Sequence, residues 1–347
     1  MRPETEPELS DIIRSAEGPL RPIGGGTRLE PGEGQGAQID MSGLRGVTLY
    51  EPEALTLVVR AGTPLSEVQN LLASEGQMLG FEPDLRAGST IGGVVAANAS
   101  GPRRVLVGAC RDAMIGLRFV TGTGEVVKNG GRVMKNVTGY DLVKLLAGSR
   151  GSLGILTEIA FKTAPIPPAR ATLSLPGLDA ASAVAALTSA LTGPFDVSGA
   201  GWLPTRGALL RIEGLEASVR LRAEALAARL APFGEVQVET HDPWPSLVQQ
   251  SARGDLWRII CNPSEAAGLL AALPAPLAVD WGGSLIWVAL PPGELPALPG
   301  FSGQARRITG AAPARLPAPD PRIARLESDL RQRFDPRGIF SDLVGAR

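Results

Sequence analysis

Hydrophobic positions in the first half of the chain alternate between helical and strand periodicity. Ahead of Gly18, apolar residues recur at helical spacing, at Leu9, Ile12, Ile13 and Ala16. Residues 55, 57 and 59 are apolar at every second position, which predicts a half-buried strand. Thr63 as the N-cap and Pro64 at the first helical position predict a helix that runs to Gly76. Further strands are predicted as a hairpin of 117–121 with 125–128, and at 155–161.

After the prolines of 165–168 the pattern changes to longer elements. Asp179 is the predicted N-cap of a helix that ends before Gly193, and a second helix is predicted over 216–230. Apolar runs predict strands from about residue 171, at 197–202, 208–212 and 236–239. The resulting order of strand, helix, strand, strand, helix, strand is typical of a ferredoxin-like α+β sheet. Residues 256–290 repeat strand, helix, strand, strand more loosely.

The last part of the chain predicts a connection and one more helix. Residues 291–321 hold eight prolines and predict an extended connection rather than folded structure. Asp320 and Pro321 predict a helix start, and the helix is expected to dock through the stripe Ile323, Leu326, Leu330 and Phe334. We therefore expect three parts, 1–168, 169–318 and 319–347, of which the last returns to the first.

Composition narrows the classes of protein and site. A chain of 347 residues with 44% hydrophobic residues and a net charge of -1 is typical of a globular protein of two domains, and it lacks the basic surface that nucleic acid requires. The polar, acidic first ten residues and the absence of a long apolar stretch predict a cytoplasmic protein with no transmembrane segment. With two cysteines and one histidine, the chain alone forms neither a four-cysteine iron–sulfur site nor a histidine-clustered metal site, so any cluster must belong to a partner.

Three glycine-rich segments are candidate ligand loops. The first, PIGGGTR at 22–28, can turn several backbone N–H groups toward an anion, and its spacing matches neither the Rossmann nor the Walker loop. The second, 88–103, lets a large planar or pyrophosphate-bearing ligand lie against small residues, with Arg103 as a charged fork. The same small residues also suit close packing of a helix against a sheet. The third, 151–158, is a glycine turn that enters a strand.

Together, these segments resemble the vanillyl-alcohol-oxidase, or PCMH-type, family of FAD-binding proteins. The motifs KNVTGYDL at 135–142 and FDPRGIF at 334–340 belong to the same resemblance. Within the family, the chain looks most like the small flavin-binding subunits of three-subunit bacterial glycolate oxidases. The resemblance covers 18–165 and 334–341 and is weak through 170–315. It implies an α+β protein with a two-part PCMH-type FAD-binding domain and a ferredoxin-like cap.

The resemblance also implies a cofactor site. In the first loop, the residues implied to hold the FAD pyrophosphate are Ile23, Gly24, Gly25, Gly26 and Thr27. In the second segment, the implied contacts are Gly88, Thr90, Ile91, Gly92, Gly93, Ala97, Ser100, Gly101 and Arg103. Gly108 ends a triplet that is often Arg-Tyr-Gly in the family and is Leu-Val-Gly here, and Ile155 corresponds to a contact with the adenine end. Many members tether the flavin through a histidine of the first loop, which has none here, so we predict non-covalent FAD.

The function implied by the resemblance is that of a subunit in a glycolate, or other 2-hydroxy-acid, oxidase or dehydrogenase complex. FAD would accept a hydride from the small substrate and pass electrons to an iron–sulfur subunit. A larger flavin subunit is the second expected partner, and these partners could bring the chain to a membrane. Two alternatives stay open: a non-catalytic FAD-bound scaffold, and an autonomous flavin oxidase of another substrate.

No catalytic residue is assigned from the sequence. His241 lies in a polar turn, where a surface or structural role is expected. The residues Arg206, Arg211 and Arg258 lie on predicted cap strands and could either bind carboxylates or be solvated. Packing is expected for the five tryptophans, and a buried apolar role for Cys110.

Overall fold

The computed structural model describes residues 1–31, 36–131, 139–248, 250–310 and 314–340. Contacts within the chain divide it into two compact units. Unit 1 comprises Met1–Ser100, Gly108–Ile166 and Pro319–Arg347, and unit 2 comprises Gly101–Val107 and Pro167–Ala318. The seven residues 101–107 therefore group with unit 2, although the sequence analysis placed them in the first part.

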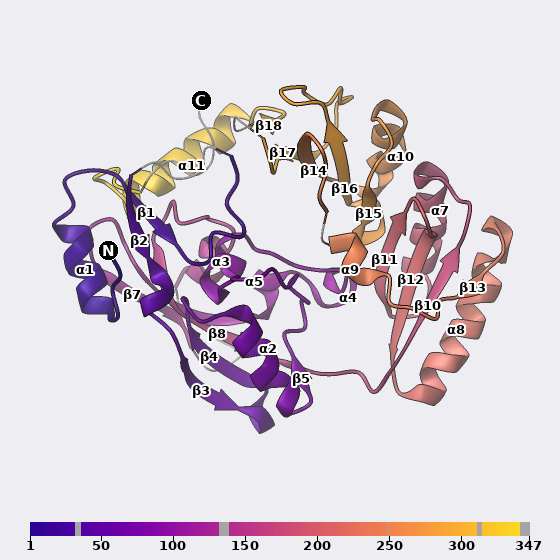
Figure 1. The fold of residues 1–347 in the computed structure, drawn as a ribbon, viewed down its shortest axis with the longest axis horizontal. Helices are drawn as coiled ribbons and strands as arrows, with labels where there is room; N and C mark the ends of the chain where they lie inside the picture. Colours follow the sequence, from indigo (N-terminus) through magenta and orange to yellow (C-terminus); the bar gives the residue numbers. More distant parts are fainter. Residues whose placement is uncertain (32–35, 132–138, 249, 311–313, 341–347) are drawn as a thin grey trace. The chain divides into compact units, whose positions relative to one another are not determined.

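A five-stranded antiparallel sheet forms the centre of unit 1 (Figure 1). In spatial order its strands are β3 (Val47–Glu51), β4 (Thr56–Arg60), β8 (Ile155–Lys162), β6 (Met114–Val120) and β7 (Val126–Gly130). The β6–β7 hairpin and β8 confirm the predicted elements. The predicted half-buried strand is β4, but the four residues from Thr56 to Val59 are all buried. Leu55 precedes this strand in a left-handed turn, with φ 51°.

Short helices surround this sheet, and two small strand pairs complete unit 1. The helices are α1 (Glu6–Arg14), α2 (Leu65–Ser74), α3 (Ile91–Ala96), α5 (Cys110–Ala113) and α6 (Leu142–Leu146). The pairs are β1 (Leu20–Ile23) with β2 (Ala37–Asp40), which is parallel, and β5 (Gln77–Met78) with β9 (Ala164–Pro165), which is antiparallel. The predicted cap of α2 is wrong: the Thr63 hydroxyl donates to the Arg60 carbonyl at 2.7 Å, so it fastens the turn after β4 instead.

Unit 2 is a nine-stranded sheet made of two ferredoxin-like halves. The first half runs β10 (Ala169–Leu175), α7 (Ala180–Leu191), β11 (Val197–Leu203), β12 (Gly207–Gly214), α8 (Glu216–Leu230) and β13 (Gln237–Val238). Its spatial order, β13-β10-β12-β11, confirms the ferredoxin-like prediction. The second half runs β14 (Asp255–Cys261), α10 (Pro263–Ala272), β15 (Ala278–Asp280), β16 (Leu285–Leu290) and β17 (Gly303–Arg307).

The second half repeats the strand arrangement of the first. Its order β15-β16-β14-β17 is the same pattern reversed, and the halves join where Trp202 of β11 pairs with Val279 of β15. One face packs against α7, α8 and α10, and the buried side chains of these helices form one core with the sheet (Figure 1). The other face packs against α9 (Trp244–Val248) and α4 (Arg104–Val107). All five tryptophans are buried in this unit, as their expected packing role requires.

Two expectations for the end of the chain need correction. Residues 303–307 are not an extended connection, because β17 pairs with β14 and with the short β18 (Arg315–Leu316). The run 300–312 contains no proline, so its N–H groups are free to join the sheet. Helix α11 (Pro321–Phe334) begins at the predicted cap Asp320, but of the predicted apolar stripe only Leu330 and Phe334 pack against the core of unit 1. Its residues Ile323 and Leu326 are 48% and 59% exposed.

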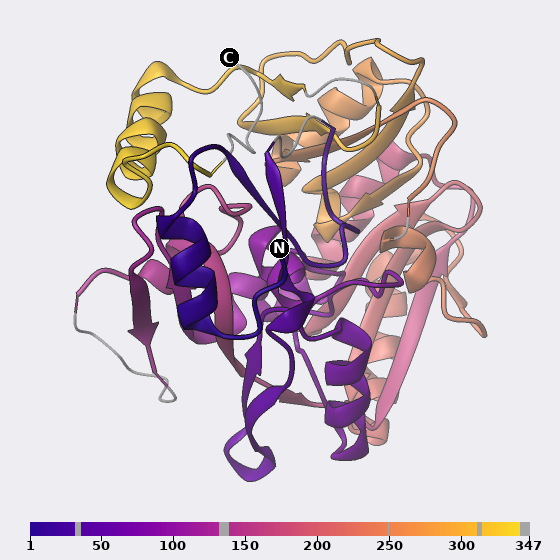
Figure 2. The same cartoon turned by 60° about the vertical axis from the view of Figure 1, so that its left-hand side comes forward.

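The described C-terminal segment returns to the N-terminal part of unit 1 (Figure 2). The Leu20 N–H donates to the Ile339 carbonyl at 2.7 Å, and Leu20 forms a parallel bridge with Phe340. Arg337 donates to the carbonyls of Ile13, at 2.9 Å, and Arg14, at 3.2 Å, near the end of α1. Up to Phe340 the segment therefore lies against the N-terminal part of unit 1, and 341–347 lie outside the described residues. Among the described helices, none is long and apolar enough to cross a membrane.

Candidate functional site

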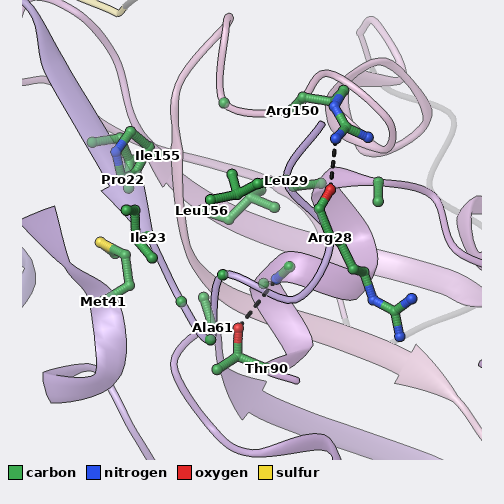
Figure 3. A pocket seen from close by; sticks show the side chains of 18 of the residues that line it. Pro22, Ile23, Arg28, Leu29, Met41, Ala61, Thr90, Arg150, Ile155 and Leu156 are labelled. Carbon is green, nitrogen blue, oxygen red and sulfur yellow. Dashed lines mark hydrogen bonds between the residues drawn. The ribbon is translucent and has the colours of Figure 1, made fainter. Parts of the chain in front are cut away.

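The first glycine loop leaves β1 and forms one wall of a pocket in unit 1 (Figure 3). The space between atoms in this pocket amounts to about 780 Å³, which includes open solvent at its mouth. Its lining consists of Pro22, Ile23, Gly24, Gly25, Gly26, Thr27, Arg28, Leu29, Met41, Ala61, Thr90, Gly92, Gly93, Ala96, Ala97, Arg150, Gly151, Gly154, Ile155 and Leu156. Thus all three glycine-rich segments contribute to one cavity.

Two glycines of the first loop are required by contact with the second segment. A Cβ on Gly25 would lie 1.6 Å from the Gly88 carbonyl oxygen, and one on Gly24 would lie 2.1 Å from Thr90 Oγ1. The Thr27 and Ser89 hydroxyls join the same two segments by a hydrogen bond of 2.9 Å. The loops therefore support each other at van der Waals distance, which only glycine allows at these positions.

The second segment turns into α3 at the pocket wall. The Thr90 side chain caps this helix and accepts from the Gly93 N–H at 3.4 Å (Figure 3). A Cβ on Gly92 would lie 2.9 Å from the Ala61 side chain, so this glycine lets the helix pack against the sheet. Around an added Cβ on Gly93, only Thr90 Oγ1 lies within 4 Å, at 3.4 Å. Of the two, Gly93 is therefore the one whose missing side chain leaves space in the pocket.

Arginine side chains hold the first loop from behind. Arg28 forms a buried ion pair with Asp84, at 2.5 Å, and Arg150 forms one with Glu30, at 3.2 Å. Arg150 also donates to the Arg28 carbonyl at 2.7 Å (Figure 3). Arg86 donates to the Thr27 carbonyl at 3.0 Å. Burial lowers the pKa of the Arg28 guanidinium, although the Asp84 carboxylate opposes this effect. The loop is thus rigidly held, as an anion-binding backbone must be.

Comparison with known proteins identifies the family. The family described as FAD binding domain matches residues 1–130. Glycolate oxidase subunit GlcE of Escherichia coli (strain K12) is 36% identical over 313 residues, which cover 88% of this chain and 86% of that protein. The chain belongs to the PCMH-type FAD-binding family.

Two further relatives show how far the likeness extends. Glycolate oxidase subunit GlcD of Bacillus subtilis (strain 168) is 34% identical over 178 residues, which cover 49% of this chain and only 38% of that protein. The solved structure of alkyldihydroxyacetonephosphate synthase matches 98% of this chain and 76% of its own, with a TM-score of 0.71 at 16% identity, which shows a shared fold. FAD is the cofactor of this family member.

Most residues predicted to bind FAD lie in the pocket wall. These are Ile23, Gly24, Gly25, Gly26, Thr27, Thr90, Gly92, Gly93, Ala97 and Ile155. Gly88, Ile91, Ser100 and Gly108 belong to unit 1 but are not in the lining, and Gly101 and Arg103 group with unit 2. Gly88 supports Gly25, and the Ser100 hydroxyl accepts from the Cys110 N–H at 2.9 Å. Residues 135–138 of the KNVTGYDL motif lie outside the described residues.

The structure adds lining residues that the sequence reasoning missed, chiefly Arg28, Met41, Ala61 and Arg150. Arg28 follows the first loop directly and Arg150 precedes the third, so their positions next to glycine loops were an available signal. Met41 and Ala61 follow β2 and β4, and only the fold brings them to the pocket.

The residues present fit a dinucleotide. The backbone at Gly26 and Gly93, which carries no Cβ, and the hydroxyls of Thr27 and Thr90 suit a pyrophosphate, and the apolar lining suits the rings.

The other candidate side chains are occupied elsewhere. His241 is exposed, with Nδ1 3.0 Å from Thr240 Oγ1, in agreement with a surface role. Arg206 pairs with Glu239 at 2.8 Å. Arg211 is 1% exposed and donates to Ser198, so it is not solvated. The guanidinium of Arg258 lies 5.3 Å from the Trp281 ring centroid.

Proposed function

We propose that this chain is the FAD-binding subunit of a 2-hydroxy-acid oxidase complex, in which other subunits complete the reaction. The observation that carries the proposal is the chemistry of the described pocket wall. Its polar side chains are Thr27, Arg28, Thr90 and Arg150, and both arginines are ion-paired. Such a wall binds and orients a cofactor, whereas removing a proton from a substrate requires a general base.

The proposal assigns separate tasks to the pocket residues. The backbone N–H groups of 24–27 and the Thr27 hydroxyl would bind the pyrophosphate, with Arg150 supplying positive charge nearby. Ala96, Ala97 and Ile155 would contact the flat rings. When bound, FAD would supply the redox chemistry: it can accept a hydride from the 2-hydroxy acid and pass the electrons to an iron–sulfur partner. Glycolate is the first substrate to test, because the Escherichia coli relative that matches 88% of this chain is named a glycolate oxidase subunit.

An anaerobic reduction experiment tests the proposal. The purified chain with FAD is mixed with glycolate or D-lactate, and the absorbance of oxidised flavin is followed. We expect no bleaching by the chain alone and bleaching once the larger flavin subunit and the iron–sulfur subunit are added. Rapid bleaching by the isolated chain would instead establish an autonomous flavin oxidase.

A scaffold role is the second candidate, supported by the lack of a titratable base in the described lining. It predicts that a complex whose copy of this chain lacks FAD turns over normally. Replacing Gly25 would disturb the loop itself, because an added Cβ collides with the Gly88 carbonyl. Gly93→Leu is the better variant, because it fills the pocket and leaves the loop contacts intact. Normal glycolate oxidation by the Gly93→Leu complex would favour the scaffold.

The partners can be tested by affinity purification of the tagged chain from its native host. We expect an iron–sulfur protein and a larger flavoprotein to co-purify in fixed proportion. Recovery of the chain alone at native expression would contradict the complex.

A further inference from the structure

Residues Gly101–Val107, here called the inserted segment, belong to unit 2 although unit 1 precedes and follows them. They come directly after α3 and Ala97, which line the FAD pocket. Simple connection of two domains does not need such a detour, because the chain already crosses between the units at 166–167 and 318–319. The segment therefore calls for another explanation.

Specific contacts anchor the inserted segment in unit 2. Arg103 forms a buried ion pair with Glu213 of β12. Trp281 Nε1 donates to the Gly101 carbonyl at 3.1 Å, and the Arg104 guanidinium lies 4.3 Å from the centroid of the Trp281 ring. Val105 packs against the hydrophobic cluster that contains Trp281. Ion pair, hydrogen bond and ring contact together fix the segment within that unit.

The two ends of the inserted segment are joined to each other in unit 1. The Arg111 N–H donates to Asn98 Oδ1 at 3.0 Å, and the Cys110 N–H donates to Ser100 Oγ at 2.9 Å. Asn98 has a left-handed backbone, with φ 47°, which turns the chain out of α3. The segment is thus a closed loop whose base and tip are fastened in different units.

The base of this loop is part of the pocket structure. Ala96 lines the pocket, and its carbonyl accepts from the Arg150 N–H at 3.0 Å. The Val95 carbonyl accepts from the Gly148 N–H, also at 3.0 Å. The end of α3 therefore positions the third glycine loop, and a displaced base would move Ala96 and Arg150 together.

We propose that the inserted segment makes the FAD affinity of unit 1 depend on its anchorage in unit 2. Arg103 and Trp281 are then positioning residues, and the contact that the family resemblance gives to Arg103 is replaced by the ion pair with Glu213. The inference rests on the FAD site proposed above. By reciprocity, bound FAD also stabilises the inserted segment.

Buried ion-pair variants within unit 2 test this inference. Arg103→Met removes the anchor, and Arg103→Lys keeps its charge. The matched control is Arg307→Met. Arg307, on β17, is 6% exposed, as Arg103 is, and it pairs with Asp255 of β14 at 3.0 Å, away from the inserted segment. Trp281→Phe removes the hydrogen bond to Gly101 but keeps an aromatic ring beside Arg104, and it serves where Arg103→Met does not fold.

FAD binding to each apo-protein is measured by quenching of flavin fluorescence. We expect Arg103→Met to raise the Kd at least about fivefold, Arg103→Lys to recover most of this loss, and Arg307→Met to stay within about twofold of the unaltered chain. Trp281→Phe should fall between these limits. Equal Kd values for Arg103→Met and Arg307→Met would overturn the inference.

Amide hydrogen exchange in the inserted segment supplies a second measurement, which does not depend on the stability of the variants. In the unaltered chain, FAD should slow exchange at Leu106 and Val107, whose N–H groups donate to the Arg103 carbonyl within unit 2. Unchanged exchange there on FAD binding would also overturn the inference. Failure of the unaltered chain to bind FAD would refute the cofactor site itself, a result distinct from equal Kd values among the variants.

Discussion

Glycine is required at several pocket positions for different physical reasons, which the sequence alone could not distinguish. Gly24 and Gly25 are required by contact between two loops, and Gly92 by contact of α3 with Ala61. Of the two alternatives weighed for the second segment, helix packing holds at Gly92, while Gly93 leaves space for the ligand surface that we propose. Glycine spacing predicted the pocket. Whether a Cβ added at a given glycine meets open space or a backbone oxygen depends on the fold, so the sequence could not show it.

Gly93→Leu should abolish tight FAD binding without destabilising the apo-protein. The added side chain extends into the pocket, whereas loss of glycine favours the helix by about 0.5–1 kcal/mol. We expect a Kd increase of at least about tenfold, or about 1.4 kcal/mol, in a fluorescence titration. The control is Gly268→Leu, at a helical glycine of α10 with no atom within 4 Å of an added Cβ. Equal FAD affinities of the two variants would contradict the pocket assignment.

FAD should leave the protein when it is denatured. The first loop has no histidine, and Cys110 is fully buried, where burial raises the pKa of its thiol and keeps it protonated. Cys110 also lies outside the pocket lining. After acid precipitation we expect the yellow colour in the supernatant, in both the unaltered chain and Cys110→Ala. A yellow pellet that Cys110→Ala abolishes would show a cysteinyl link.

At the scale of elements, prediction succeeded where capping and periodicity agree. Helix α7 begins after its predicted cap, Asp179, whose carboxylate accepts from the Ser182 N–H. Helix α8 also has the predicted bounds, although no side chain caps its N-terminus. It failed where a tertiary partner decides the outcome. Thr63 resembles a cap in sequence, yet its hydroxyl bonds to Arg60. Proline content on both sides concealed β17, since this strand depends on its neighbours β14 and β18 rather than on the residues next to it in sequence.

Glu6 should fasten α1 to the central sheet in a pH-dependent way. Burial raises its pKa, but hydrogen bonds from Arg118 Nε, at 2.8 Å, and Thr157 Oγ1, at 2.5 Å, outweigh burial and hold it below 4.5. We expect Glu6→Gln to lower the free energy of unfolding by about 1–2 kcal/mol at pH 7, measured by urea denaturation. The control is Glu17→Gln, just after α1, where the carboxylate is exposed.

The sign of the pH effect follows from the lowered pKa of Glu6. Its ionised form is stabilised in the folded protein, so its contribution is present above the unfolded value near 4.5 and is lost as the pH falls through the folded value. The gap between the unaltered chain and Glu6→Gln should therefore narrow below about pH 4.5. A gap independent of pH from 7 to 3 would mean that Glu6 acts only through packing.

At the scale of the whole molecule, the sequence predicted two α+β parts but not how the sheet of unit 2 is shared. The first ferredoxin-like half is readable because its six elements follow in order with clear boundaries. In the second half an extended chain replaces the helix between β16 and β17, so the repeat is incomplete in sequence. The inserted segment was also hidden, because Gly101–Val107 reads as a continuation of the glycine-rich run.

Arg337 should act as a clamp that closes unit 1 across the whole length of the chain. Its guanidinium donates to the carbonyls of Ile13, Arg14 and Ala16, where a cation also complements the C-terminal end of α1. We expect Arg337→Gln to destabilise the protein by about 1 kcal/mol, lowering the Tm of unit 1 by about 2–4 °C. The control Arg333→Gln removes an exposed arginine of α11 and should leave Tm unchanged.

Because β1, which leads into the first glycine loop, bridges to Phe340 beside Arg337, added FAD should recover part of the Tm lost in Arg337→Gln. A Tm equal to that of Arg333→Gln would show that β1 and Phe340 close the unit without the arginine.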